Sequence, residues 1–456
     1  MNKANLLIAA VLLMFATLAQ AVEEAAGRVG NMSGTLVVQR VDGTVNVVGP
    51  RSEVFAGDML ITAKDSYAQV EMNDGTKMTL RPNSNLRIEA YQFRTETPQS
   101  DSIVLRLLKG GFRTVTGLIG KRGNTDAYKL RAATATIGIR GTDFSSRLCV
   151  TKDCKDDDEA KATHEVKPPV TPSPVVGRVM LVQGELSAKE EEGKVRKLTL
   201  GAPVYEGDAL TTGKKSYAVV AFRDEGRVSL QESTVFRVEK FKYDKAAAQE
   251  NAVLRLLKGG VRVVTGLIGR VNRDNYQFKV ATATIGIRGT GFDAWCNGPC
   301  ASGADNPGAT PGDPLDGAGV FVWAGEVVMV TPGASFVVAI QQAAIIARDT
   351  GKPLRIIAIP PNIMNNNTPR PDSIPLDMEK LFGTESDAGN PGVYVTVHDG
   401  YVVLSMGDKS LDLFQGDTGF ADSLTLKLLS KTPGFMGDSM EIIMTDKNGQ
   451  SCTIGS

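Results

Sequence analysis

Few side chains in this chain could carry out catalysis. Only two histidines occur: His164 lies in a stretch rich in charge and proline, and His398 stands beside Asp399-Gly400, where a turn is predicted. A Ser-His-Asp triad and a histidine-rich metal site both need an imidazole that is held in place by surrounding elements. We therefore predict no catalytic residues, no metal site and no bound cofactor.

Two other side chains are candidate nucleophiles. Ser439 lies in Gly437-Asp438-Ser439-Met440, which resembles the nucleophile block of a lipase family, but both histidines precede it, whereas that family has its histidine near the end of the domain. Cys452 would need a neighbouring base to become a reactive thiolate, and the sequence indicates none. A serine or cysteine hydrolase is therefore the weakest of the functions considered.

The other four cysteines form two close pairs. Cys149 and Cys154 are five residues apart and Cys296 and Cys300 are four apart, which predicts two short disulfide loops in an oxidising compartment. The alternative is one zinc ion bound by all four thiolates, although neither pair has the two-residue spacing typical of such sites. Cys452 is left over, either free or bridged to another molecule.

Basic residues are the remaining candidates for binding. They recur in two equivalent stretches and could form two faces that bind an anionic polymer or an acidic protein segment. The alternative is an ordinary solvent-facing strand surface. The six residues are Arg106, Lys109, Arg113, Arg255, Lys258 and Arg262. Arg140 and Arg288 differ, because each lies in a small and apolar string, which predicts partial burial and a structural hydrogen bond.

The N-terminal residues predict export. Lys3 precedes the apolar run 6–18, and Ala19-Gln20-Ala21 is a small-x-small cleavage site. We therefore predict a signal peptide at residues 1–21, cleaved after Ala21, and a periplasmic or secreted mature protein. No later apolar run is long enough to span a membrane. Lys plus Arg and Asp plus Glu both total 51, so overall charge does not favour nucleic acid.

The elements that must position these residues follow an internal repeat. The string 105–111 recurs unchanged at 254–260, and 133–142 recurs at 281–290. Within the first copy, Ala68, Val70 and Met72 alternate with polar residues, as in a strand with one buried face. Similar short runs recur about every ten residues, which predicts an all-β fold, either a sandwich or a β-solenoid. Gly110 and Gly259 are predicted corners that need positive φ.

Composition divides the chain into segments. Val337 to Arg348 is ambiguous, because its Ala and Gln content would also allow a helix, and it is interpreted as strands from its neighbours. A short helix is expected near 376–382. The string 319–328 resembles 392–403, so the tail should be β as well and contain two partial units. The predicted segments are a first repeat at 22–150, an acidic and proline-rich linker at 151–175, a second repeat at 176–300, a Gly/Pro-rich linker at 301–319 and a β-rich C-terminal region at 320–456.

Taken together, the repeated strings resemble the FecR domain. The resemblance rests on Gly57-Asp58, Ser66-Tyr67-Ala68, the string 105–111 and the closing Arg140-Gly141-Thr142-Asp143-Phe144, with matching strings in the second copy. It implies a periplasmic β-rich interaction module with no catalytic residues to carry over. The best-known members pass a message from an outer-membrane receptor to a sigma factor. This chain has no predicted membrane or cytoplasmic segment, so we do not extend the sigma-factor role to it.

The sequence therefore predicts a non-catalytic binding or scaffold module. Its expected partner is a periplasmic or outer-membrane protein, or an anionic envelope polymer; no nucleic acid partner and no membrane span in the mature chain are expected. The alternative function is a sensor that passes a signal from a receptor to a separate membrane regulator.

Overall fold

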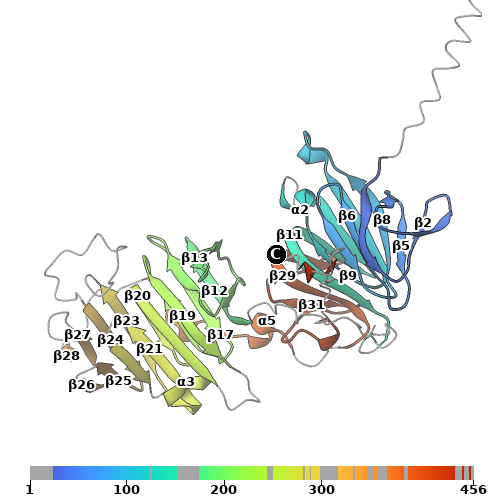
Figure 1. Cartoon of the computed structure of the whole chain (residues 1–456). Coiled ribbons are helices and arrows are strands. Elements are labelled where there is room, and N and C mark those ends of the chain that lie inside the picture. Colours follow the sequence, from blue (N-terminus) through green and yellow to red (C-terminus); the bar gives the residue numbers. More distant parts are fainter. Residues whose placement is uncertain are drawn as a thin grey trace, which may run out of the picture.

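The chain folds almost entirely into β-strands, which confirms the all-β prediction, and the strands form two adjoining sandwiches (Figure 1). No helix among the described residues is long and apolar enough to cross a membrane. The computed structural model describes residues 24–122, 126–151, 154, 174–243, 250–280, 283–287, 289–297, 317–331, 334–346, 353–356, 367–384, 389–436, 444–445 and 451–452.

The second repeat shows the architecture in one continuous stretch. One layer consists of β12 (Val175–Gln183), β15 (Pro203–Tyr205), β17 (Tyr217–Phe222), β18 (Arg227–Leu230), β23 (Gly291–Asn297), β24 (Gly317–Ala324), β27 (Ala343–Ile346) and β28 (Pro353–Ile356). The other consists of β13 (Leu186–Lys189), β14 (Val195–Lys197), β16 (Ala209–Thr212), β19 (Val235–Lys242), β21 (Tyr276–Val280), β22 (Ala283–Ile287), β25 (Glu326–Thr331) and β26 (Ala334–Ala339). A long strand, β20 (Asn251–Val264), runs through both layers.

The first repeat has the same arrangement but takes its last strands from the end of the chain. Its N-terminal part contains β1 (Gly27–Ser33), β2 (Leu36–Gln39), β3 (Val45–Val48), β4 (Glu53–Val54), β5 (Met59–Thr62), β6 (Tyr67–Met72), β7 (Lys77–Leu80), β8 (Asn85–Gln92), β9 (Ser102–Val115), β10 (Tyr128–Ala132) and β11 (Ala135–Cys149). It is completed by β29 (Gly392–Met406), β30 (Lys409–Phe414), β31 (Thr418–Ala421) and β32 (Leu426–Leu429).

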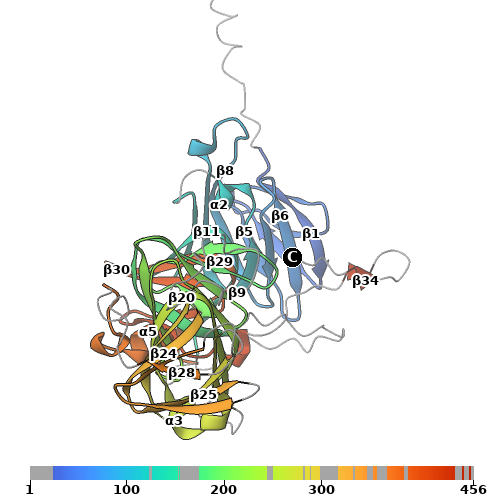
Figure 2. The same cartoon turned by 90° about the vertical axis from the view of Figure 1, so that its left-hand side faces the viewer.

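The pairing of β11 with β29 is what closes the first sandwich. It runs from Thr136 opposite Ser405 to Cys149 opposite Gly392, and β11 and β29 lie side by side in two perpendicular views (Figures 1 and 2). The second sandwich is therefore inserted between two strands of the first. The C-terminal region expected at 320–456 is not one unit: residues 317–356 complete the second repeat, and residues 392–429 complete the first.

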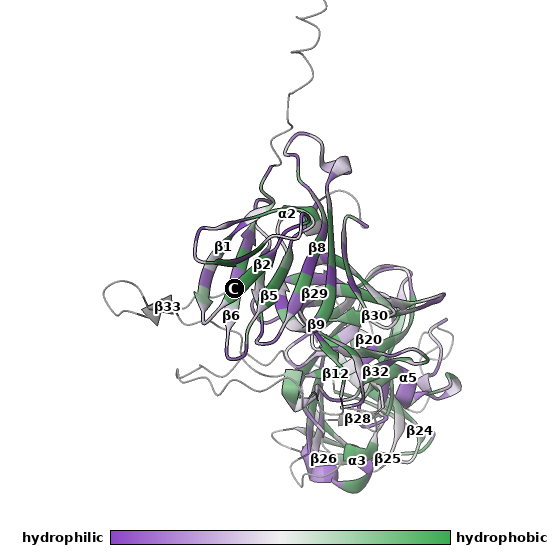
Figure 3. Ribbon diagram, turned by 90° about the vertical axis from the view of Figure 1, so that its right-hand side faces the viewer, coloured by the Kyte–Doolittle hydropathy of each residue, from purple (hydrophilic) through white to green (hydrophobic). Residues whose placement is uncertain are grey.

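Both cores are formed by the inward faces of alternating strands. Hydrophobic and hydrophilic residues interleave along them (Figure 3), and Ala68, Val70 and Met72 are buried as predicted. Strict alternation after the buried Leu86 and Ile88 would also turn Ala90 inward, but Ala90 is exposed because the register with β9 shifts between Ile88 and Ala90. The ambiguous stretch 337–348 contributes to β26 and β27, and the expected short helix is α5 (Met378–Phe382).

Two glycines mark the points where β9 and β20 change layers. Gly110 has φ +72° and Gly259 has φ +82°. A Cβ on Gly110 would lie 2.7 Å from Ser84 Cα, and one on Gly259 would lie 2.8 Å from Thr234 Cα. Both β9 and β20 continue past this corner and are followed by short helices that the sequence did not predict, α2 (Leu118–Lys121) and α3 (Leu267–Val271).

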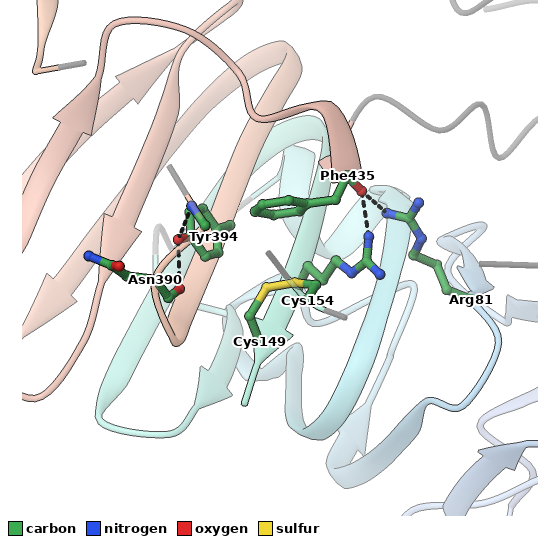
Figure 4. Close-up of a disulfide and its surroundings, with 8 residues drawn as sticks. Arg81, Cys149, Cys154, Asn390, Tyr394 and Phe435 are labelled. Atoms are coloured by element: carbon green, nitrogen blue, oxygen red, sulfur yellow. Dashed lines mark hydrogen bonds between the residues drawn. A yellow bond between two sulfur atoms is a disulfide. The ribbon is translucent and has the colours of Figure 1, made fainter. Parts of the chain in front are cut away.

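A disulfide lies in a small apolar cluster outside the main core. Cys149 and Cys154 are bonded, which confirms the predicted pair and removes the four-thiolate zinc alternative. The cluster includes Tyr394 and Phe420, whose ring centroids are 4.9 Å apart, and Phe435 (Figure 4). Cys296 is buried in β23, Cys300 lies outside the described residues, and Cys452 is in β34 (Ser451–Cys452), paired with β33 (Met444–Thr445).

The end of the first sandwich is tied to this cluster. The carbonyl oxygen of Phe435 accepts hydrogen bonds from Arg81 Nη1 at 3.2 Å and Arg147 Nη1 at 2.5 Å, and its ring packs 5.0 Å from that of Tyr394 (Figure 4). Tyr394 Oη in turn donates to the carbonyl of Asn390 at 2.7 Å. Phe435, which follows β32, is thus bound to Arg147 of β11 and packed against Tyr394 of β29.

Candidate binding face

One row of side chains crosses the layer that contains β8, β9 and β10. In the first repeat the strand register aligns Val45, Gln39, Met59, Arg87, Arg106, Arg131, Thr136 and Ser405 on successive strands. In the second repeat it aligns Val195, Lys189, Ala209, Arg237, Arg255, Lys279, Thr284 and Val330. The neighbours of Arg87 along its strand, Leu86 and Ile88, are fully buried, so the row faces away from the core. We call these positions the basic rows.

Each basic row places three cations on three adjacent strands, and the second row also contains Lys189. Neighbouring strands are roughly 4.8 Å apart, and like charges directly opposite each other are unfavourable. One carboxylate offsets part of this repulsion: Glu89 pairs with Arg106 and, at 3.0 Å, with Arg131. The hydrogen bond from Arg106 lowers the pKa of Glu89. In the second repeat Glu239 pairs in the same way with Arg255 and Lys279.

The third cation of each row has no such partner. Among the described residues, the side chains of Arg87 and Arg237 form no ion pair and no hydrogen bond, and both are exposed. A guanidinium presents five N–H donors in a planar fork that suits carboxylate and phosphate oxygens. Each row therefore offers one arginine that is free to bind an anion.

The structure divides the six predicted basic residues between two layers. Arg106 and Arg255 lie in the rows. Lys109 pairs with Asn85, and Lys258 with Val235, where the strand approaches its corner. Arg113 and Arg262 come after the corner, in the opposite layer. They therefore do not share a face with Arg106 and Arg255.

Arg113 and Arg262 are already bound to carboxylates. Arg113 donates to both oxygens of Asp143, at 2.9 and 2.6 Å, and Arg262 lies 3.5 Å from Asp293. Sequence reasoning missed Arg87 and Arg131, because strand register rather than chain proximity brings them beside Arg106. The signal that could have found them is their recurrence as basic residues, Arg237 and Lys279, at the same places in the second copy.

Arg140 does not occupy the expected position. It is exposed on β11 instead of partly buried, because its side chain lies on the outer face, with its guanidinium 5.7 Å from the centre of the Tyr401 ring. Tyr401 Oη donates to Asp412 at 2.5 Å on the next strand. Arg288 lies outside the described residues.

His398 lies inside β29 and not in a turn. Its Nε2 is 2.8 Å from Ser145 Oγ, and burial together with the nearby Arg113 cation lowers its pKa to about 4. Ser145 is buried, and the nearby carboxylate of Asp143 is held by Arg113. The strand register places Trp323 of the second repeat at the position of His398 and Asp293 at that of Ser145.

The second repeat fills this position with different chemistry. Trp323 Nε1 donates to Asp293 Oδ1 at 3.2 Å, which links the same two strands as the Ser145–His398 bond. A tryptophan cannot act as a general base, yet it serves in the same place. We therefore interpret both pairs as cross-strand ties and not as catalytic groups.

A turn with an aromatic residue three positions before the aspartate of Gly-Asp occurs three times in the part of the chain that the structure describes. In each turn the aspartate accepts a hydrogen bond from the backbone N–H three residues before it: Asp58 from Phe55 at 2.8 Å, Asp208 from Tyr205 at 2.9 Å and Asp417 from Phe414 at 3.0 Å. Each aspartate also binds an arginine. The third copy, Phe414-Gln415-Gly416-Asp417, escaped sequence reasoning, although it has the same order of an aromatic residue, any residue and Gly-Asp as the other two.

The partner of the third turn comes from the other sandwich. Arg40 and Arg196 belong to the same repeats as Asp58 and Asp208, at 3.2 and 2.6 Å, whereas Asp417 pairs with Arg178 of β12. Both side chains of this last pair are buried. Val175 and Tyr205 pack beside it against Phe382, Met378 and Leu381 of the α5 region. The two sandwiches therefore meet in an interface with an apolar part and a buried ion pair.

The comparisons with known proteins agree with the repeat. The family model described as FecR protein matches residues 58–164 and 208–302, and the chain is a member of the FecR domain family with two tandem FecR regions. No curated protein matches the sequence.

Solved structures give only distant similarities. Two crystal structures of a protein provisionally assigned as an anti-sigma factor, from Parabacteroides distasonis, are 16% and 15% identical, with a TM-score of 0.24 each; each match covers 32% of this chain and 58% of that one. A cell surface anchoring domain is 22% identical with a TM-score of 0.13, covering 14% of this chain and 82% of that one. All three TM-scores lie below 0.5, so these structures add nothing to the family assignment.

Proposed function

We propose that the chain is a non-catalytic signal-transduction module of the cell envelope that acts by binding another protein. The observation that carries the proposal is the basic row, which both FecR regions present with one unpartnered arginine each. The FecR match supports a signalling role, and it brings no catalytic residues to this chain. The signal-peptide pattern of residues 1–21 supports a periplasmic location, which belongs to the same proposal.

The edge of each sandwich extends the proposed binding face. The outer β3 strand carries Val45 and Val47, which are 59% and 74% exposed, and Val195 of β14 is 64% exposed. Val45 and Val195 stand at the first position of the two basic rows. An unpaired strand edge with apolar side chains is a surface that proteins usually cover, and a partner that adds to it would reach the arginines. We therefore expect a periplasmic or outer-membrane partner with an acidic segment.

Site-specific crosslinking in intact cells tests the partner. A photoreactive amino acid replaces Val47 or Val195, and the captured proteins are identified by mass spectrometry. Leu424 is the control position, because it is 81% exposed but lies between β31 and β32, at the other end of the strand order from β3. Capture of the same protein from Val47 or Val195 and not from Leu424 supports the proposal. Equal capture from all three positions contradicts it.

A transcription measurement separates signalling from a purely structural role. The Arg87→Gln/Arg237→Gln variant should alter transcription of the genes that respond to deletion of the protein, because both unpartnered guanidiniums are removed. Unchanged transcript levels in the deletion strain would remove the signalling part of the proposal. That result would favour the second candidate function, a scaffold that binds an anionic envelope polymer along the same basic rows.

A further inference from the structure

We infer that a pocket in the first repeat binds a small, multiply charged oxyanion that carries phosphate or carboxylate groups. The pocket has a volume of about 530 Å³ and lies over the first basic row, between the β2–β3 hairpin loop and the side chains of Arg87 and Arg131. It goes beyond the proposed function, because it requires no protein partner. Its lining residues are Gln39, Arg40, Val41, Gly43, Gly57, Arg87, Glu89 and Arg131.

The pocket collects more positive charge than its own carboxylate can offset. Arg40 pairs with Asp58 behind the pocket at 3.2 Å but remains 30% exposed. Glu89 is shared by Arg131 and Arg106, so it is not available to Arg87. Arg87 is therefore the unpartnered cation of the wall, flanked by two further guanidiniums. Such a cluster suits an oxyanion that can accept several N–H bonds at once.

The second repeat provides an internal comparison. Its loop carries Glu190 and Glu191 where the first repeat has Arg40 and Val41. The packing confirms the correspondence, because a Cβ on Gly57 would collide with Val41, and one on Gly207 would lie 3.2 Å from Glu191 Cγ.

The loop of the second repeat is therefore more acidic than the loop of the first. Asp208 is bound there by Arg196, which also pairs with Glu190 at 2.7 Å, so one arginine serves two acidic groups. The equivalent wall has as many acids as bases, with Glu190, Glu191 and Glu239 against Lys189, Arg237 and Lys279, whereas the first wall has three arginines against Glu89 alone. The structure therefore assigns the anion pocket to the first repeat alone.

The size of the pocket indicates the kind of ligand. Sites for small organic molecules usually enclose about 300–1,000 Å³, so this pocket has room for more than an inorganic ion. Bidentate pairing of guanidinium with oxygen does not distinguish phosphate from carboxylate. The shared chemistry is a doubly charged oxyanion on a small organic molecule, and the test below separates the two groups.

Calorimetric titration of the whole mature chain tests the pocket. The probes are inorganic phosphate and succinate, with ionic strength held constant by sodium chloride. One site per chain is expected for at least one probe, and the probe that binds identifies the charged group. Arg87→Gln should weaken binding at least tenfold, whereas the matched Arg237→Gln should change it less than twofold. Two sites per chain, equal effects of both variants or no binding of either probe would overturn the inference.

A second variant imitates the second repeat without disturbing the core. Val41 is 78% exposed, so Val41→Glu should fold normally and place a carboxylate beside Arg40, as Glu191 is placed in the other copy. We expect Val41→Glu to abolish anion binding and the neutral Val41→Gln to retain it within about threefold. Retained binding in Val41→Glu would place the anion elsewhere. These titrations use purified protein, so failure here leaves the crosslinking result untouched.

Discussion

Single residues that occupy equivalent places in the two repeats separate structural roles from functional ones. His398 and Trp323 stand at the same position of the β-sandwich, and each is hydrogen-bonded to a residue of the neighbouring strand, Ser145 or Asp293. What the two copies share is the tie between strands, and the ring chemistry differs. The comparison therefore indicates that His398 contributes to stability and not to catalysis.

His398 should make the first sandwich sensitive to acid. Its pKa is about 4 in the folded chain and 6.5 for an unperturbed imidazole, so the unfolded state binds a proton more readily. The stabilisation is complete above pH 6.5 and is lost as pH falls toward 4. Between pH 7.5 and 5.0 the wild type should lose about 2 kcal/mol more than His398→Gln in urea unfolding.

In the comparison with His398→Gln, the contributions of the other titrating groups to the pH dependence of stability cancel. Asp224 and Asp293 have their pKa raised to about 6, chiefly by burial, and they contribute equally to both proteins. Glutamine retains a polar atom for Ser145. Unfolding free energies that stay parallel from pH 7.5 to 5.0 would show that His398 titrates normally.

Gly110 should tolerate no side chain. In Gly110→Val the new atoms would meet the backbone of Ser84, and the residue would also have to keep φ at +72°. We expect a loss of more than about 3 kcal/mol of stability. Gly75 is the matched control, since its φ is +83° and a Cβ placed there would have no atom within 4 Å. Gly75→Val should cost less, about 1–2 kcal/mol, from backbone strain alone. Equal unfolding midpoints would contradict the steric argument.

At the scale of elements, the Gly-Asp turn is the recurring unit of the molecule. Within the described residues it occurs three times with the same hydrogen bond between the aspartate and the backbone, and an arginine binds the aspartate each time. Arg40 and Arg196 each lie in the same repeat as the aspartate they bind, whereas Arg178 and Asp417 lie in different sandwiches. A local turn has thus become part of the interface between the repeats.

Removing Arg178 should therefore be costly. Burial raises the pKa of Asp417 in spite of the neighbouring arginine, so the carboxylate depends on Arg178 for its charge. Arg178→Ala leaves this acid buried without its cation and should cost about 3–5 kcal/mol. The double variant Arg178→Met/Asp417→Asn should recover much of this loss, because no buried charge remains. Urea unfolding of both variants checks this, and an Arg178→Ala variant as stable as the wild type would contradict it.

Alternation in the sequence located most strands, but it could not say which strands would pair. Ala68, Val70 and Met72 point inward as predicted, because period-two patterning depends only on local geometry. Three other features depend on strand register between distant segments. They are the bulge that exposes Ala90, the inclusion of His398 in β29, and the row that contains Arg87 and Arg131. The sequence shows that 319–328 resembles 392–403, but it does not show that the two segments complete different sandwiches.

At the scale of the whole molecule, the second sandwich is an insertion. It enters between β11 and β29, the junction that corresponds to the connection between β23 and β24 in the second repeat. The first sandwich is therefore discontinuous in sequence and continuous in space. The β29–β32 segment supplies its missing edge as well as the Asp417 turn of the interface.

The insertion predicts that the two sandwiches differ in independence. Residues 174–356 contain every strand of the second repeat and should fold alone. Residues 24–154 should not, because β11 would keep β9 and β10 but lose its long pairing with β29. Joining 24–154 to 389–436 by a short Gly/Ser linker should restore folding, since Cys149 and Gly392 are cross-strand neighbours. The joined protein also carries Asp417→Asn, because Arg178, the ion-pair partner of Asp417, is absent from it. Circular dichroism and thermal unfolding check all three, and a cooperative transition in 24–154 alone would refute the prediction.

The insertion also determines how tension would pass through the molecule. Residues 24 and 436 both belong to the first sandwich, so a pull between them loads that sandwich directly. The second sandwich is inserted between β11 and β29, which are paired with each other, so it bears no load until these two strands separate. A stretched chain would therefore open in a fixed order, first sandwich first, and the length released in the first step would include the undisturbed second sandwich as a rigid spacer.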